Sequence, residues 1–338
     1  MVWVVANSNV ALVKYWGKSD EGAKHPAAPS LSVTLDSLST AASVELSDDS
    51  KEDRIEGLPL PATAKVEAFL DEFRSRFGIH AHARVRLASN FPVAAGLASS
   101  ASTFAALAKA LATEASLELE GGELADLARI GSGSACRSVY GGFVEWRPEG
   151  DGSVVEQVAA KDHWRLCILV AVTSERPKAV GSSAGMRRTA ETSPYYRSWI
   201  ESGTADLVEV RAGIRARSLS RVGAAAERNC MRMHAAAIAA VPSLLYWEPA
   251  SLAVMRRVWE LRERGVEAYF SIDAGPQVKV FCEGGSAAVV EAALDGVPGV
   301  LRVLSAEPGD APRIVPHPPA WAAKWGAAEG QPSRAVAS

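Results

Sequence analysis

The sequence predicts an α+β protein built from two domains. At 338 residues the chain is longer than one ordinary hydrophobic core requires. Strand-like and helix-like patterns are mixed in both halves, and the pattern changes to long Ala/Arg-rich helical stretches beyond residue 172. We therefore expect the boundary at Ser174–Pro177, with an N-terminal domain at 1–175, a C-terminal domain at 176–320 and a tail at 321–338.

In the first half, β-branched residues and partial alternation predict strands at 2–6, 31–36 and 42–47. Helical spacing predicts a helix over 62–78, which Gly78 can end. An alternating strand at 82–91 follows, then a helix over 99–115. A further helix, a Gly/Ser turn, a short helix and a strand reaching Trp146 complete the expected domain.

In the second half, the continuous apolar run at 165–172 is typical of a buried strand. Residues 182–241 are expected to be mostly helical, and a helix is predicted over 249–264. A strand–turn–strand then spans 266–282, and a helix and a strand occupy 286–305.

Composition and charge exclude several classes of protein. The hydrophobic share is 48%, the charged share is 22% and the net charge is −3, so a basic surface for nucleic acid or an anionic membrane is not expected. We found neither a signal peptide nor an uninterrupted apolar run of membrane-spanning length. The four separated cysteines favour reduced thiols. Together these features predict a cytoplasmic protein.

The stretch NFPVAAGLASSAST at 90–103 combines small residues with a predicted helix start. Unpaired N–H groups at a helix N-terminus, joined by serine hydroxyls, can bind phosphate oxygens. A serine-capped helix packed closely on a strand would show the same residue types, and the residues alone do not decide between the two.

Three further stretches carry residues suited to anions or to proton transfer. GSGSACRS at 131–138 places Arg137 beside two Gly–Ser pairs, where an anion-binding arginine and a solvated one both stay open. KYWGK at 14–18 would place Lys14, Trp16 and Lys18 on one face if it were a strand, which lysine-protected edge strands also do. Asp273 ends an apolar strand before a tight turn, where it could equally form an Asx turn.

In this order the motifs resemble those of the mevalonate diphosphate decarboxylase family of the GHMP kinase superfamily. The matching stretches are NVALVKYWGK, PSLSVTLD, NFPVAAGLASSAS, GSGSACRSVYGGFVEW, GSSAGMRRTAETSP and DAGP, between residue 9 and about residue 276. The resemblance implies a ribosomal protein S5 domain 2-like N-terminal domain, a ferredoxin-like C-terminal domain and an active site in the cleft between them.

The resemblance also implies a reaction. ATP, with Mg²⁺, phosphorylates the tertiary 3-hydroxyl of mevalonate 5-diphosphate. The 3-phosphate then leaves as C1 departs as CO2, and the product is isopentenyl diphosphate. A homodimer is the implied assembly.

Roles for individual residues follow from the same resemblance. Asp273, Lys14 and Arg137 match the catalytic base, the lysine near the transferring phosphoryl group and the arginine that holds the C1 carboxylate. The matched substrate-binding residues are Tyr15, Lys18, Ser132, Ser134, Ser182 and Met186. The matched ATP-binding residues are Pro92, Ala95, Gly96, Leu97, Ala98, Ser99, Ser100 and Ser102, with Ser100 a candidate Mg²⁺ contact.

Ala28, Pro29 and Gln277 depart from the family pattern. Because these positions are expected near the cleft, a phosphomevalonate decarboxylase stays open as a second reading of the same motifs. A GHMP small-molecule kinase that does not decarboxylate stays open as well, and so does a relative that binds ligands without turnover.

Overall fold

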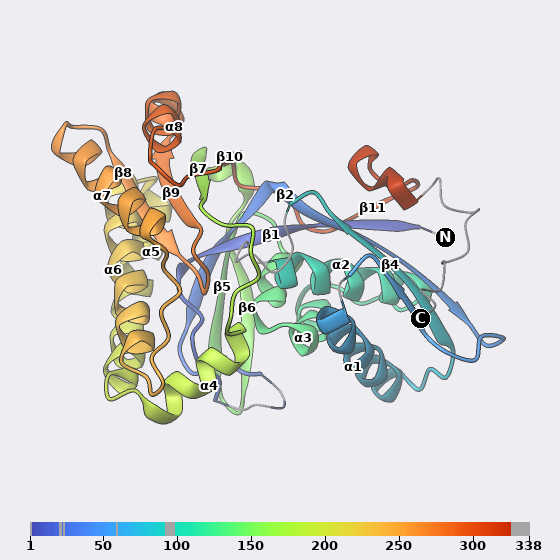
Figure 1. Cartoon of the computed structure of the whole chain (residues 1–338). Coiled ribbons are helices and arrows are strands. Elements are labelled where there is room, and N and C mark those ends of the chain that lie inside the picture. Colours follow the sequence, from blue (N-terminus) through green and yellow to red (C-terminus); the bar gives the residue numbers. More distant parts are fainter. Residues whose placement is uncertain (1, 20–21, 23, 59, 92–98, 326–338) are drawn as a thin grey trace, which may run out of the picture.

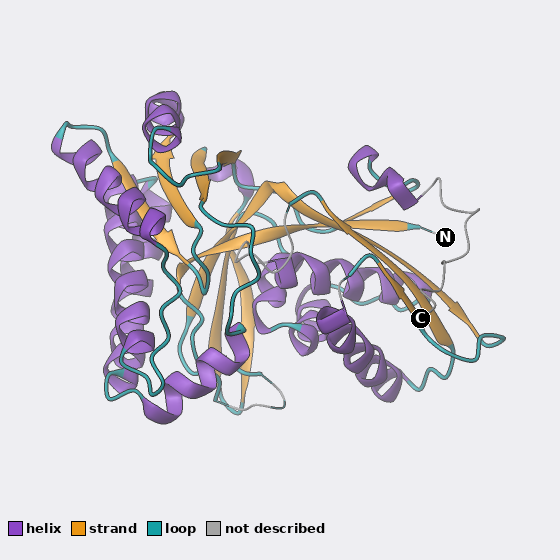
Figure 2. Cartoon of the chain, in the orientation of Figure 1, coloured by secondary structure: helices purple, strands orange, loops and turns teal. Residues whose placement is uncertain are grey.

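The fold contains two β-sheets, one in each part of the chain (Figures 1 and 2). A computed structural model describes residues 2–19, 22, 24–58, 60–91 and 99–325. One sheet has seven strands and the other has four. This arrangement confirms the predicted two-domain mixture of strands and helices.

The seven-stranded sheet is built on two long antiparallel strands, β1 (Trp3–Val13) and β2 (Ser30–Ser47). Its order is β11-β1-β2-β4-β3, and β2 also pairs with β5, which pairs with β6. The remaining strands are β3 (Arg54–Glu56), β4 (His82–Ser89), β5 (Phe143–Glu149), β6 (Gly152–Ala159) and β11 (Arg313–Val315).

The two long strands are longer than their sequence patterns predict. Asn7 and Asn9 interrupt the apolar run, but both are buried and bonded, so the strand continues through a register shift between them. The strands predicted at 31–36 and 42–47 are parts of the single strand β2, whose first part pairs with β5 and whose second part pairs with β4.

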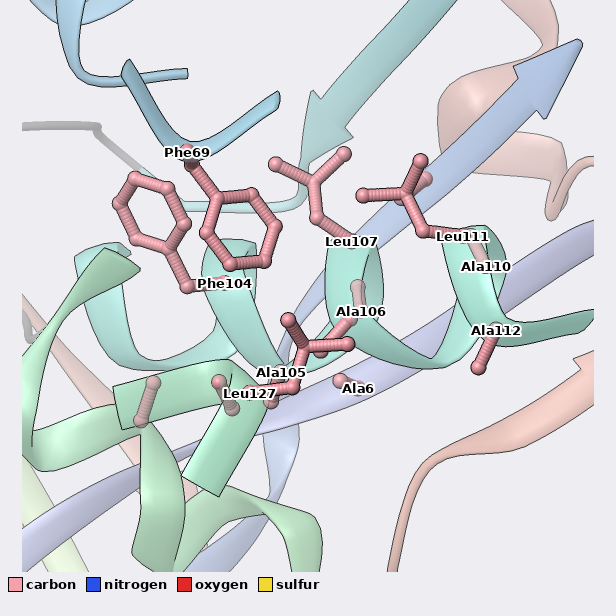
Figure 3. Close-up of a cluster of buried hydrophobic side chains, with 14 of the residues drawn as sticks. Ala6, Phe69, Phe104, Ala105, Ala106, Leu107, Ala110, Leu111, Ala112 and Leu127 are labelled. Atoms are coloured by element: carbon pink, nitrogen blue, oxygen red, sulfur yellow. The ribbon is translucent and has the colours of Figure 1, made fainter. Parts of the chain in front are cut away.

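Three helices cover one face of this sheet: α1 (Leu60–Phe77), α2 (Ser99–Glu114) and α3 (Gly121–Gly131) (Figure 1). Figure 3 shows Phe69 of α1 against Phe104 of α2, with ring centroids 5.2 Å apart. The alanines of α2 are buried between the larger side chains, so the helix lies close to the sheet. The predicted bounds of α1 and α2 agree with the structure to within two residues.

The four-stranded sheet has the order β10-β7-β9-β8 and is antiparallel throughout. Its strands are β7 (Leu166–Val172), β8 (Ala268–Ile272), β9 (Val278–Glu283) and β10 (Arg302–Ala306). The helices that follow β7 are α4 (Ser182–Thr192), α5 (Tyr196–Ala216), α6 (Leu219–Ile238), α7 (Pro249–Glu263) and α8 (Ala287–Asp295). Among the described residues no helix is long and apolar enough to cross a bilayer.

The sheets divide the chain earlier than the boundary expected at Ser174–Pro177. That boundary puts β7 in the N-terminal domain, but β7 pairs with β9 and β10 of the second sheet. Its apolar sequence shows that the strand is buried on both faces, and this property does not identify the sheet that it joins. At the other end, β11 returns to pair with β1, and Ala322 packs beside Trp3, so residues 313–325 contact the first sheet. The rest of the expected tail, 326–338, lies outside the described residues.

The two parts share a hydrophobic core. Val10, Leu12 and Val13 of β1 pack in one cluster with Val210 of α5 and Val222 of α6. This shared core fixes the end of β1 against the second sheet, and that contact positions the candidate site.

Gln277, the departure expected near the cleft, is a buried internal link instead. Its side-chain oxygen accepts from the Thr173 N–H at 2.7 Å, and its amide donates to the Ser174 carbonyl. The side chain therefore joins the end of β7 to the start of β9, and both of its polar atoms are occupied.

Gln277→Leu is expected to lower the free energy of unfolding by about 1–3 kcal/mol, because the Thr173 N–H and Ser174 carbonyl lose buried partners. Denaturant unfolding with an unchanged m-value measures the loss. Thr204→Val, at an exposed position on α5, is the control and should change it by less than about 0.5 kcal/mol. An unchanged stability with an altered KM for the substrate would instead mean that Gln277 faces the ligand.

Candidate active site

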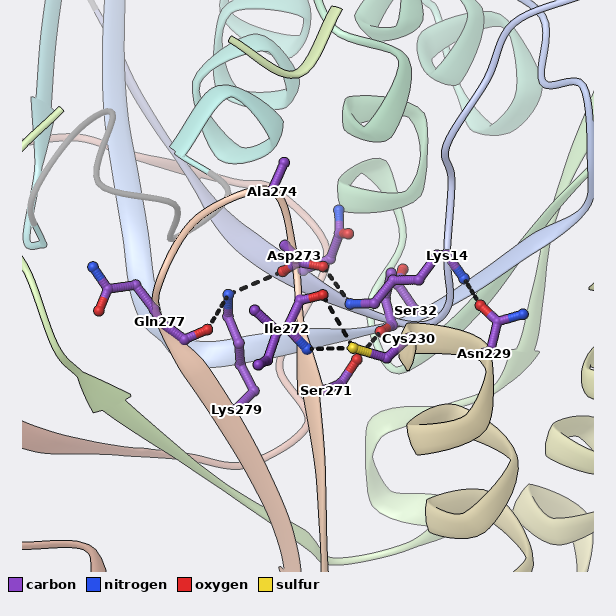
Figure 4. A network of polar contacts seen from close by, with 12 residues as sticks. Lys14, Ser32, Asn229, Cys230, Ser271, Ile272, Asp273, Ala274, Gln277 and Lys279 are labelled. Atoms are coloured by element: carbon purple, nitrogen blue, oxygen red, sulfur yellow. Dashed lines mark hydrogen bonds and ion pairs between the residues drawn. The ribbon is translucent and has the colours of Figure 1, made fainter. Parts of the chain in front are cut away.

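The centre of the site is an ion pair between Lys14 and Asp273, which lie 259 positions apart in the chain (Figure 4). Lys14 directly follows β1, and Asp273 directly follows β8. The Lys14 Nζ lies 2.5 Å from the Asp273 Oδ1. Lys14 is buried, whereas the Asp273 side chain is 23% exposed although its Oδ2 atom is buried.

The strand before Asp273 is held on two sides. The Ser271 hydroxyl donates to the Ala11 carbonyl of β1 at 3.1 Å, and the Cys230 thiol and His234 ring on α6 both lie within bonding distance of the Ile272 carbonyl. After Asp273 the chain turns, with the Gly275 N–H donating to the Asp273 carbonyl at 2.8 Å. These contacts leave the carboxylate little freedom to move.

Lys14 is positioned through its backbone. The Lys14 N–H donates to the Asn229 Oδ1 at 2.8 Å, and the Asn229 amide donates to the buried Asp206 at 3.0 Å. Asp206 is in turn paired with Arg228 at 2.6 Å and with Arg232 at 3.3 Å. A chain of polar contacts thus connects the surface of α6 to the active lysine.

Asp273 has a second cationic partner that the sequence did not indicate. The Lys279 Nζ of β9 lies 3.1 Å from the Asp273 Oδ2 (Figure 4). Burial would raise the pKa of Asp273, but the ammonium groups of Lys14 and Lys279 outweigh it and hold the pKa well below its usual range. The carboxylate is therefore ionised at neutral pH.

A third lysine beside Asp273 was also missed. The Lys178 ammonium donates to the Ser182 hydroxyl at 2.8 Å and to the Ala274 carbonyl at 3.0 Å. Burial lowers its pKa to about 8, and nearby Asp273 opposes that effect. The signal that the sequence offered was the position of Lys178, four residues before Ser182, the first residue of α4.

Arg137 is a buried cation whose guanidinium is bonded to hydroxyl groups rather than to a carboxylate. It lies on the 3-10 helix η1 (Gly133–Val139), and its guanidinium donates to Ser32 at 2.9 Å and to Ser30 at 2.8 Å. Among the described residues no carboxylate forms an ion pair with it, and burial lowers its pKa. A guanidinium has five N–H donors, and a buried charge without an opposite charge is costly, so the arrangement suits an anionic ligand.

Two predicted serine motifs meet at the start of α2. Ser100 is exposed in the first turn, and its hydroxyl lies 3.1 Å from that of Ser132, which lies 3.5 Å from that of Ser134. Ser102 differs from the expectation: it is fully buried, and its hydroxyl contacts Thr40 at 2.8 Å. Its role is to pack α2 on β2. Pro92, Ala95, Gly96, Leu97 and Ala98 lie outside the described residues.

The KYWGK stretch is not a strand, because β1 ends at Val13. The Tyr15 ring packs on Trp146 with centroids 4.7 Å apart, and Lys18 is half-buried in a bridge with Pro26. Gly17 has φ +140, and a Cβ there would lie 1.9 Å from the Tyr196 hydroxyl, so only glycine fits.

The remaining predicted substrate-binding residues lie on α4. Ser182 begins that helix and bonds Lys178. Met186 is buried in a cluster with Trp16, Trp199 and Tyr246, so most of its surface contributes to packing.

The site therefore gathers four cations around one carboxylate: Lys14, Lys178, Lys279 and Arg137 surround Asp273. In the part of the chain that the structure describes, no cluster of His, Cys, Asp or Glu has the composition of a metal site. Excess positive charge in a partly closed site favours anions such as carboxylates and phosphates.

Comparison with known families matches both parts of the chain. Residues 6–156 match the diphosphomevalonate decarboxylase-like N-terminal domain, and residues 168–301 match the mevalonate 5-diphosphate decarboxylase C-terminal domain. The chain belongs to the diphosphomevalonate decarboxylase family. The resemblance inferred from the motifs is thereby confirmed.

Individual relatives agree with this family. The human diphosphomevalonate decarboxylase is 36% identical over 83% of this chain and 76% of its own. A solved mevalonate diphosphate decarboxylase from Enterococcus faecalis superposes with a TM-score of 0.86 at 35% identity, over 94% of this chain and 99% of that one. The Staphylococcus aureus enzyme gives 0.87 at 34% identity, over 93% and 98%.

The pKa of Lys178 generates a pH prediction. Its ammonium form is held below about pH 8 and lost above it. If the ammonium contacts an anionic ligand, kcat/KM for the decarboxylase reaction should fall as the pH rises through about 8. In Lys178→Arg, where the charge persists at all accessible pH, the fall should disappear while much of the activity remains.

Lys178→Met is the matched comparison. It should lower kcat/KM at neutral pH, and its pH profile should no longer show the fall in kcat/KM above about pH 8. A limb that persists unchanged in Lys178→Arg would show that another group titrates and that Lys178 does not contact the ligand.

Proposed function

We propose that the chain converts mevalonate 5-diphosphate and ATP to isopentenyl diphosphate, ADP, phosphate and CO2, with Asp273, Lys14 and Arg137 as its catalytic residues. The observation that carries the proposal is the single ionised carboxylate held among buried cations, two of which have no carboxylate partner among the described residues. A solved relative was crystallised with MVAPP, AMPPCP and magnesium, which supports an anionic substrate and a nucleotide at this site.

Asp273 accepts the proton of the 3-hydroxyl as that oxygen attacks the γ-phosphorus of ATP. A carboxylate between two ammonium groups is a weak base, but phosphoryl transfer passes through a loose transition state in which the proton can leave late. Its main contribution is to orient the hydroxyl oxygen, and the fixed turn after β8 suits that task. Lys14, at 2.5 Å from Asp273, stabilises the charge on the transferring phosphoryl group.

Arg137 holds the C1 carboxylate. After the 3-hydroxyl is phosphorylated, the C3–O bond breaks with its electrons on phosphate, and the C1–C2 bond electrons form the new C2=C3 double bond. In the same event C1 departs as CO2. Ser30, Ser32 and Asn9 take three of the five N–H groups of Arg137, and in the described structure two remain for a carboxylate.

The start of α2 receives the ATP phosphates. Backbone N–H groups of its first turn and the exposed Ser100 hydroxyl are donors suited to phosphate oxygens, and Ser132 lies beside them. The donor set fits a triphosphate that carries its own Mg²⁺, which neutralises phosphate charge when bound. Lys178, beside Asp273, is a further cation for these oxygens.

The predicted substrate-binding roles of Tyr15, Lys18, Ser132, Ser134 and Ser182 belong to the same proposal. So do the homodimer and the cytoplasmic location, which stay predictions.

Mass analysis of the products from ATP-Mg²⁺ with the diphosphate, and separately with the monophosphate, tests the reaction. CO2 release distinguishes a decarboxylase from a kinase, and better use of the monophosphate would favour a phosphomevalonate decarboxylase.

Asp273→Asn is expected to lower kcat by about 10²–10⁴-fold with little change in ATP binding, because the proton acceptor is lost. Steady-state ADP release and nucleotide binding by calorimetry measure the two quantities. Asp71→Asn, at an exposed carboxylate paired with Arg74, is the control. Near-normal turnover by Asp273→Asn would exclude this residue as the base.

Arg137→Gln is expected to uncouple the two steps, because the carboxylate loses its bidentate partner while the phosphoryl site is retained. CO2 release should fall more than ADP formation, and a 3-phosphorylated intermediate should accumulate in single-turnover mass spectra. Equal loss of both products, with no intermediate, would contradict the assigned role.

A further inference from the structure

We propose that Lys279 is a positioning residue, which holds the Asp273 carboxylate ionised and oriented while Lys14 engages the transferring phosphoryl group. The inference rests on the proposed function, since it assigns Asp273 as the proton acceptor. In the part of the chain that the structure describes, the ion pair with Asp273 is the contact through which Lys279 acts on the reaction.

The geometry separates the two lysines. Lys14 contacts Oδ1 of Asp273 at 2.5 Å and approaches from the end of β1, whereas Lys279 contacts Oδ2 at 3.1 Å from within β9 (Figure 4). Each carboxylate oxygen therefore has its own cation. The Lys279 Nζ also lies 3.4 Å from the Gln277 carbonyl, which further fixes the ammonium.

The position of Lys279 is an unfavourable one for a charge. It lies in an interior strand, opposite Val170 of β7 and Ser271 of β8, and its side chain is 2% exposed. Neighbouring Val278 and Val280 pack in the core, and burial lowers the pKa of Lys279 while Asp273 opposes that shift. An apolar side chain at this position would avoid the desolvation cost, so the lysine is explained by its partner.

A second cation is needed because Lys14 has two tasks. As Lys14 turns toward a phosphoryl oxygen, its contact with Asp273 weakens. Burial would then favour the protonated carboxyl, which cannot accept the hydroxyl proton. Lys279 faces Asp273 from the sheet side and keeps its contact, so the carboxylate stays ionised throughout the step.

The test compares Lys279→Met and Lys279→Arg with the wild type, and uses Lys161→Met as a control because Lys161 lies in an exposed pair with Asp310. Removing the cation raises the pKa of Asp273. Because kcat reports groups of the ligand-bound enzyme, an acid limb should appear in kcat of Lys279→Met between about pH 5 and pH 9, where the wild type shows no acid limb. At neutral pH kcat should fall by about 10–100-fold, as for loss of other outer partners of a reacting group, with KM for ATP nearly unchanged.

Lys279→Arg should restore most of kcat and remove this acid limb, because the charge is retained. Loss of activity by the same factor at every pH, together with a lower unfolding temperature and no rescue by arginine, would overturn the proposal in favour of a packing role. Wild-type kinetics in Lys279→Met would overturn it as well.

A measurement independent of turnover separates this inference from the proposed function. The ¹³C signal of the Asp273 carboxylate, identified by its loss in Asp273→Asn, can be titrated in the ligand-free protein. A higher carboxyl pKa in Lys279→Met supports the contact even if the wild type decarboxylates neither substrate. An unchanged titration overturns the contact even if the wild type is an active decarboxylase.

Discussion

The ion pair between Lys14 and Asp273 is the contact on which the site depends. It joins the end of the first strand of one sheet to a turn in the other, so it exists only when both sheets are formed and packed together. The shared core of β1, α5 and α6 supplies that packing. Since a partly buried ion pair contributes little net stability, the fold is what places the pair, and the pair contributes chemistry.

Buried polar contacts connect each member of the ion pair to the rest of the fold. From Lys14, a chain of contacts runs through Asn229 to Asp206 and the arginines of α6. From Asp273, β8 is tied back to β1 through Ser271. Because Lys14 is fixed through its backbone N–H and Asp273 lies between two ammonium groups, the lysine and the carboxylate are held in place before any ligand arrives, which is the form of preorganisation that phosphoryl transfer requires.

The sequence predicted the parts of the site that lie in distinctive motifs. Lys14, Arg137 and Asp273 were implied by the family resemblance that KYWGK, GSGSACRS and DAGP carry. Lys178 and Lys279 could not be found this way, because a lone lysine in a loop or strand is ordinarily solvated, and only the tertiary fold places these two around one carboxylate. For the same reason, the sequence could not predict which sheet β7 joins or that the Gln277 side chain is an internal link. Each depends on a partner roughly a hundred residues away, of which local patterns carry no sign.

The concentration of positive charge makes the site suited to anionic ligands. Arg137 and Lys178 are desolvated without a carboxylate partner among the described residues, and each lowers the stability of the ligand-free fold. Anionic ligands return the missing counter-charge, so part of their binding energy offsets a cost that folding has already incurred. In the proposed reaction, groups held in this way need little rearrangement when the phosphoryl group passes from ATP to the substrate oxygen and negative charge builds on the departing ADP. Electrostatic catalysis depends on such preorganised groups. Under the proposed function, the same residues lower the stability of the ligand-free protein and stabilise the transition state, a combination that a fully neutralised core could not provide.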